Sequence, residues 1–245
     1  MLNNIKQSIL YPYKDPAWLK KLWILPLITL IPIIGIISLI ILKGWRFSMV
    51  KNLSVGNENL PELDFGTMLK NGAILWVVML SYALVPSIIL GLLGMGGPIG
   101  LLADLITIFT DGFDTWVKTE PSEIMWTFAV YTIWAIISLP IYQAGMIRFA
   151  VTGNWKSLLN VPANTFLFLR YLPSFIGFYL YWLILCLLIF IIDLALTVTV
   201  IGVILIPVVS ICLYYISSAY ELGKLAQKIK NKVNSFDEPV IAKTI

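Results

Sequence analysis

The stretch GWRFSMVKNLSVGNENLPELDFGTMLKNG, residues 44–72, is the only long polar interruption in the first half of an otherwise apolar chain. It carries Arg46 and Lys51, turns at Gly56, and meets the next apolar segment at Gly72. A polar stretch between two long apolar segments is typical of a connection at a membrane surface. We therefore predict that residues 44–72 form an interfacial elbow around which the chain is organised.

The composition indicates a membrane protein. Apolar residues make up 59% of the 245 residues, charged residues make up 12%, and the mean hydropathy is +0.90. A soluble domain has about 25% charged residues, so this chain has too little polar surface for one. The net charge is +4, and the basic residues lie at the ends of the apolar segments. That distribution is typical of membrane orientation, and we expect membrane lipids, not nucleic acid, as partners.

The apolar segments predict an all-α, polytopic helical protein with five to six membrane segments. Trp23–Leu42, Ala73–Leu93 and Ile124–Gly145 are each long enough for a hydrocarbon core of about 30 Å. Residues 98–113 are shorter and contain Asp104. They either cross the membrane or form a half-buried helix.

The rest of the chain completes three predicted regions. Residues 172–220 are apolar and too long for one crossing, so they predict two spans joined by a turn at 197–202. We predict that residues 1–22 form an amphipathic N-terminal arm, that 23–220 form the helical membrane domain, and that 221–245 form a basic amphipathic cytoplasmic tail.

A second elbow, residues 146–171, resembles the first. Three pairs of motifs match: Gly44-x-Arg46-Phe47 with Gly145-x-x-Arg148-Phe149, Gly56-Asn57 with Gly153-Asn154, and Leu60-Pro61 with Val161-Pro162. Gly, Asn and Pro are common in any loop, so chance similarity explains the match equally well. An internal repeat would have halves 23–117 and 124–220, and an odd number of segments in each half would imply inverted topology.

The distribution of Lys and Arg predicts the orientation. It places the second elbow and the C-terminus inside and the acidic loop near residues 111–123 outside. With six segments, both termini are cytoplasmic and the elbow 44–72 is outside. A re-entrant first segment would instead place that elbow inside, so its side stays open. We expect a multi-pass protein of the cytoplasmic membrane. Labelling an Asn57→Cys variant from outside the cell tests the side of the elbow.

Two stretches of the first third resemble a known family. The first is Tyr11-Pro12-Tyr13-Lys14-Asp15-Pro16-Ala17-Trp18, and the second contains Gly44-Trp45, Lys51-Asn52, Gly56, Leu60-Pro61-Glu62 and Gly72. Together they resemble DUF4013, an uncharacterised family of prokaryotic integral membrane proteins. The aromatic residue and Asp-Trp usual after Leu-Pro-Glu in that family are replaced here by Leu63-Asp64-Phe65. The resemblance implies a membrane module and no particular reaction.

The residue types argue against most catalytic chemistry. The chain has no histidine, which removes metalloprotease motifs and nucleophile–histidine pairs. Cys186 and Cys212 lie inside apolar segments without metal-ligand spacing. We expect no enzyme activity, no cofactor and no metal.

Two sets of polar residues remain as candidates for function. The elbow or interface set can shape turns, bind headgroups or contact a partner; it comprises Arg46, Lys51, Asn52, Gly56, Pro61 and Arg148. The intramembrane set would have to pair or line a water path, because a charge at mid-bilayer costs at least about 2.5 kcal/mol; it comprises Asp104, Gln143 and Asp193.

These features favour a non-catalytic membrane module or complex subunit that assembles with itself or with partner proteins. The alternative is a small permease or lipid-handling transporter built from inverted repeats. Substitution of Asp104 or Asp193 by Asn would impair a transporter and leave a scaffold intact.

Overall fold

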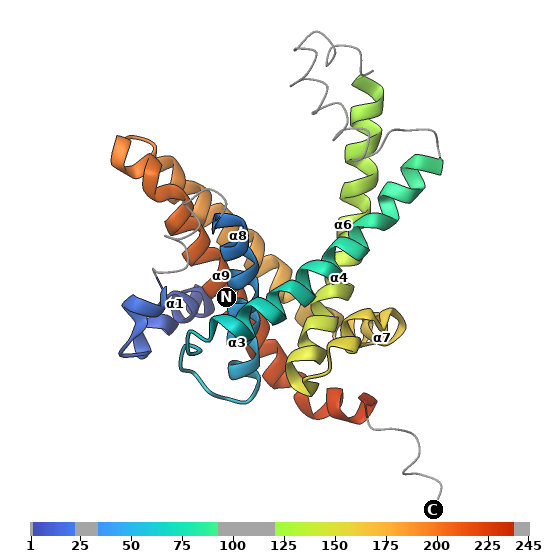
Figure 1. Cartoon of the computed structure of the whole chain (residues 1–245), viewed down its shortest axis with the longest axis horizontal. Coiled ribbons are helices and arrows are strands. Elements are labelled where there is room, and N and C mark those ends of the chain that lie inside the picture. Colours follow the sequence, from blue (N-terminus) through green and yellow to red (C-terminus); the bar gives the residue numbers. More distant parts are fainter. Residues whose placement is uncertain (1, 23–33, 93–120, 238–245) are drawn as a thin grey trace, which may run out of the picture. The chain divides into compact units, whose positions relative to one another are not determined.

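A computed structural model describes residues 2–22, 34–92 and 121–237 of the chain (Figure 1). These residues form helices, turns and loops, with no strand among them, so the all-α prediction is confirmed. The helices are α1 (Leu2–Leu10), η1 (Tyr11–Lys14), α3 (Ile34–Ser54), α4 (Phe65–Leu92), α6 (Pro121–Thr152), η3 (Trp155–Leu159), α7 (Val161–Arg170), α8 (Leu172–Leu196) and α9 (Val200–Asp237).

Within these ranges, four helices are long and apolar enough to cross a membrane, not the five to six predicted. They are Phe65–Leu92, Met125–Thr152, Leu172–Leu196 and Leu205–Lys230. The predicted segment 98–113, with Asp104, lies outside the described residues. The protein is therefore a multi-helix membrane protein with four candidate spans in its described part.

The first predicted span, Trp23–Leu42, is not among these four. Residues 23–33 lie outside the described residues, and the helix that contains the remainder runs on to Ser54. Any stretch of α3 long enough to cross a bilayer contains Lys43, Arg46 and Lys51. The hydropathy pattern predicted residues 34–42 as the end of a span. In the structure, these residues belong to a helix that continues through the more polar residues 43–54.

The chain divides into two compact units, Met1–Trp76 with Gln143–Ile245, and Val77–Tyr142. In the first, α9 packs against α1, α3 and α8 (Figure 1). In the second, the Ser87 and Tyr131 hydroxyls are 2.6 Å apart, and Trp134 Nε1 donates to the Tyr82 carbonyl at 2.8 Å. These contacts show that α4 and α6 run antiparallel there, so α4 ends and α6 begins at the same end of the pair.

The elbow predicted at 44–72 is mostly helical. α3 ends at Ser54 and α4 begins at Phe65, which leaves 55–64 as the connecting loop. Gly44 and Gly72 are not loop residues. A Cβ on Gly44 would lie 1.8 Å from the Met68 carbonyl oxygen, and one on Gly72 would lie 1.9 Å from the Ile40 carbonyl oxygen. Their lack of a side chain lets α3 and α4 touch backbone to backbone.

The second elbow also begins with a continuing helix. α6 extends to Thr152, and Gly153 then turns the chain with a φ of +72°, a conformation that favours glycine. The Asn160 side chain accepts a hydrogen bond from the Ala163 backbone N–H and caps α7.

The predicted division of residues 172–220 is confirmed. α8 ends at Leu196 and α9 begins at Val200, so the turn lies within the predicted 197–202. Thr199 stabilises the start of α9 because its hydroxyl accepts a hydrogen bond from Gly202 N–H at 2.9 Å.

Candidate functional site: the arm–loop cluster

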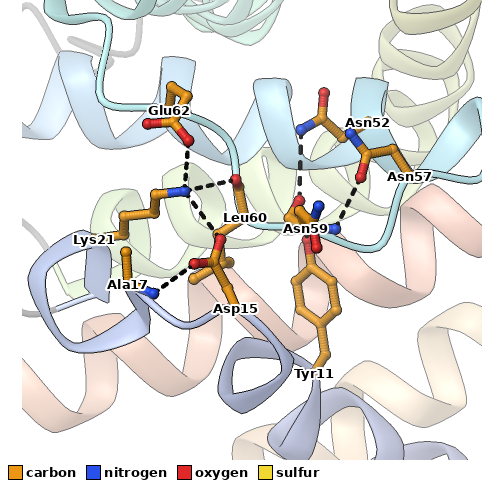
Figure 2. Close-up of polar contacts among 9 residues, drawn as sticks. All are labelled: Tyr11, Asp15, Ala17, Lys21, Asn52, Asn57, Asn59, Leu60 and Glu62. Atoms are coloured by element: carbon orange, nitrogen blue, oxygen red, sulfur yellow. Dashed lines mark hydrogen bonds and ion pairs between the residues drawn. The ribbon is translucent and has the colours of Figure 1, made fainter.

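The N-terminal arm and the 55–64 loop meet in a polar cluster. We call Lys14, Asp15, Lys21, Glu58, Glu62 and Lys224, with the backbone that they bind, the arm–loop cluster. Local turns shape both segments: Asp15 Oδ1 accepts from Ala17 N–H at 2.8 Å, and Asn57 Oδ1 accepts from Asn59 N–H at 3.0 Å (Figure 2). Such side-chain turns are a common role of Asp and Asn outside helices.

Lys21 is the centre of the cluster. Its ammonium donates to Asp15 Oδ2 at 2.9 Å, to Glu62 Oε1 at 2.8 Å and to the Leu60 carbonyl at 3.3 Å (Figure 2). The Lys21 and Asp15 side chains are only 9% and 5% exposed. One lysine thus uses three donors to fix the arm to the loop.

Glu58 connects the loop to two other segments. Its carboxylate accepts from Lys14 of the arm at 2.6 Å and from Lys224 of α9 at 2.8 Å. Beside it, the Tyr11 hydroxyl donates to the Asn59 carbonyl at 3.2 Å, and the Tyr11 ring lies 5.3 Å from the ring of Tyr220 on α9. The arm, the loop and the polar half of α9 are therefore joined directly.

The Glu58 and Asp15 carboxylates are held in the ionised form. Hydrogen bonds from Lys14 and Lys224 lower the pKa of Glu58 to about 2. Burial opposes ionisation of Asp15, but hydrogen bonds from Lys21 and Ala17 outweigh it and lower the pKa of Asp15. Burial likewise opposes the charge of Lys21, but Glu62 and Asp15 outweigh it and raise the pKa of Lys21. A general acid or base needs a pKa near the working pH, so these groups suit a structural role.

Direct hydrogen bonds join the arm to the first elbow, because Tyr11, Lys14 and Lys21 bond to residues 58–62. The expected crossing by Trp23–Leu42 falls partly outside the described residues. The sides of the membrane on which the arm and the elbow lie therefore stay a prediction.

The predicted elbow residues have different positions. Pro61 is buried between Leu60 and Glu62 of the loop, and Gly56 turns the loop with a φ of +85°. Asn52 closes this turn because its carbonyl accepts from Val55 and Asn57 N–H. Lys51 is exposed on the surface of α3.

The two predicted arginines are buried at matching places in the two elbows. Arg46 lies against the Tyr214 ring, with 5.9 Å between the guanidinium carbon and the ring centroid. Arg148 Nη1 donates to Asn164 Oδ1 at 2.9 Å. Their sequence neighbours Phe47 and Phe149 stack on each other at 4.2 Å. The sequence match between the elbows thus coincides with a direct contact between them.

Of the intramembrane candidates, Gln143 and Asp193 lie in the described part of the chain and Asp104 lies outside it, and no recorded contact joins the two that are described. Asp193 Oδ1 accepts from the Ser210 hydroxyl at 2.6 Å, which links α8 to α9. Gln143 is buried, and its Oε1 has no hydrogen-bond partner. Among the residues searched, no group of three or more His, Cys, Asp or Glu side chains could hold a metal ion.

Sequence reasoning missed Lys21, Asp15, Glu58 and Glu62 as site residues, because charge and hydropathy do not reveal which distant segments meet. One signal was present. The two stretches that carry the family resemblance contain Asp15 and Glu62, and these two carboxylates bind the same Lys21 ammonium.

The fold and this cluster define a helical membrane protein with an ordered polar surface beside the end of α3 and the second half of α9. The chain belongs to the family described as "Protein of unknown function (DUF4013)", which matches residues 27–208. A search of curated proteins and a search of solved structures gave no match.

Proposed function

We propose that the protein is a non-catalytic integral membrane module, or a subunit, that assembles with itself or with partner proteins. The observation that supports this role is the arm–loop cluster. Its buried Lys21–Asp15 pair anchors an arm whose outer surface exposes Leu10, Tyr13 and Leu19. An anchored arm with exposed apolar side chains offers a pre-organised docking surface, because little ordering entropy is lost on binding.

We further propose that this surface is cytoplasmic and that the membrane is the cytoplasmic membrane. The four candidate spans alternate in direction if the loop 55–64, the second elbow and the end of α9 are all inside. Every Lys and Arg except Lys118 then lies at or toward the cytoplasmic side, in agreement with the positive-inside rule. In this topology Asn57→Cys is protected from an impermeant thiol reagent in intact cells (native cysteines replaced). Labelling there would place the cluster outside.

The experiment that tests the main role is the native mass of the protein after mild-detergent extraction, with all co-purifying species identified. A stoichiometric partner or a defined homo-oligomer is expected. Lys21→Met, which releases the arm, should lose this association, whereas the neighbouring exposed Lys20→Met should keep it. A wild-type monomer without a partner, or a complex unaffected by Lys21→Met, would contradict the proposal.

The second candidate is a small permease or lipid-handling transporter with an internal repeat. It is favoured by the paired geometry of the two elbows: Gly56 and Gly153 both have positive φ, and Phe47 stacks on Phe149. The proposed topology gives both repeat units the same orientation, which corresponds to parallel repeats and not to inverted ones. A monomer that retains a defined lipid or solute after extraction would place this candidate first.

A further inference from the structure

The buried side of α3 carries two cations among aromatic residues. Lys43 and Arg46, one helical turn apart, are only 9% and 7% exposed. The Lys43 ammonium lies 4.6 Å from the Trp76 ring centroid of α4, and Arg46 lies against Tyr214 of α9. The Tyr179 hydroxyl of α8 is close enough to interact electrostatically with Arg46. We call Lys43, Arg46, Trp76, Tyr179 and Tyr214 the α3 basic cluster, and all five belong to one compact unit.

Hydrogen-bond donors in this cluster lack acceptors. Arg46 Nε, Trp76 Nε1 and the Tyr179 hydroxyl are buried and have no hydrogen-bond partner. Arginine and tryptophan side chains can only donate, and a tyrosine hydroxyl can donate as well as accept. None of the ion pairs recorded in the described part of the chain involves Arg46.

The buried Arg46 charge and the buried donors without acceptors are unfavourable unless a bound group supplies negative charge and acceptors. A buried charge without a counter-charge costs several kcal/mol, and so do buried donors without acceptors. Charged residues inside membrane domains commonly mark functional sites for this reason. The missing group must supply negative charge and several acceptor oxygens at once. A phosphate group does both, and the planar guanidinium of arginine matches its geometry.

We propose that the α3 basic cluster binds a phosphate group, either free phosphate or the headgroup phosphate of an anionic lipid. Arg46 supplies charge and donors, and Lys43 supplies a second positive charge. Trp76 Nε1 and the Tyr179 hydroxyl supply further donors. The Tyr214 ring orients the guanidinium through a cation–π contact. This site does not depend on the proposed assembly with partners, since it shares no residue with the arm–loop cluster.

Thermal unfolding of the purified protein in an uncharged detergent tests the site. The detergent-washed protein is titrated with inorganic phosphate or with a short-chain phosphatidylglycerol, and sodium chloride of equal ionic strength is the control. A ligand at a hundred times its Kd should raise the Tm by roughly 5–10 °C. A shift with phosphate identifies a free-phosphate site, and a shift with the lipid alone identifies a headgroup site. One phosphorus per chain retained through washing also supports a bound phosphate group. Absence of both shifts and of retained phosphorus overturns the proposal.

Substitutions test whether the residues of the α3 basic cluster cause the ligand-dependent rise in Tm. Arg46→Gln should abolish the ligand-dependent shift or the retained phosphorus, whereas Lys51→Gln, the same charge change at an exposed position of α3, should preserve it. Tyr179→Phe removes one hydroxyl and should weaken binding roughly tenfold. Without ligand, Arg46→Gln should unfold at the wild-type temperature or above it, because it removes an uncompensated buried charge. A wild-type response in Arg46→Gln, or a ligand-free Tm well below wild type, would refute a binding role for this arginine.

Discussion

The contact between α3 and α4 makes a sharp prediction for Gly44→Ala. The added Cβ would lie 1.8 Å from the Met68 carbonyl oxygen and 2.9 Å from the Met68 Cα. Ordinary contact needs about 3.5 Å, so the helices would have to separate by roughly 1.7 Å at this point. The obstructing atoms are backbone, so no change of side-chain rotamer can relieve the clash.

The expected effect is a net loss of stability of about 2 kcal/mol. Overpacking costs about 1–3 kcal/mol, at the upper end where backbone must move, and the helix propensity of alanine returns up to about 1 kcal/mol. For a chain of this size the loss corresponds to a fall in Tm of about 4–8 °C. Gly177→Ala in α8 is the matched control, because its Cβ would have no atom within 4 Å.

Thermal unfolding in mild detergent, followed by circular dichroism, measures both variants. Gly177→Ala should unfold at or slightly above the wild-type temperature, and Gly44→Ala clearly below it. If Gly44→Ala unfolds at or above the wild-type temperature, α3 and α4 do not cross as closely as described, and the reasoning fails.

Three further predictions concern the loops. Lys21→Met leaves the buried Asp15 carboxylate without its ammonium partner and should lower the free energy of unfolding by about 3–5 kcal/mol. The control Lys20→Met should change it by at most about 0.5 kcal/mol, and comparison of the two Tm values measures the difference. The stabilisation from Glu58 is complete above its ordinary pKa of 4.5 and is lost as the pH falls toward its folded value of about 2; Tm measured against pH should show this loss in wild type and not in Glu58→Gln. Gly153→Ala should lose about 1–2 kcal/mol because φ is +72° with open space around the Cβ position, and Gly153→Asn should lose less; equal losses would contradict the backbone explanation.

The sequence alone predicted the features that depend on local composition. Apolar segments of sufficient length correctly located the helices that contain 73–92 and 125–145, and the excess length of 172–220 required a turn, which lies at 197–199. The motifs at 11–18 and 44–72 indicated the family. These inferences succeed because a bilayer demands long apolar helices whatever the packing.

Only the tertiary structure decided where the polar residues of the first elbow lie. Gly44, Arg46 and Gly72 look like loop residues in sequence, yet they belong to helices, because α3 and α4 pack backbone to backbone and α9 covers Arg46. Lys21 has no local sequence feature that distinguishes it from Lys20, yet it is buried and binds Asp15 of its own arm and Glu62 of the distant loop. Such roles arise from contacts between residues far apart in the chain, and neither hydropathy nor residue spacing contains that information.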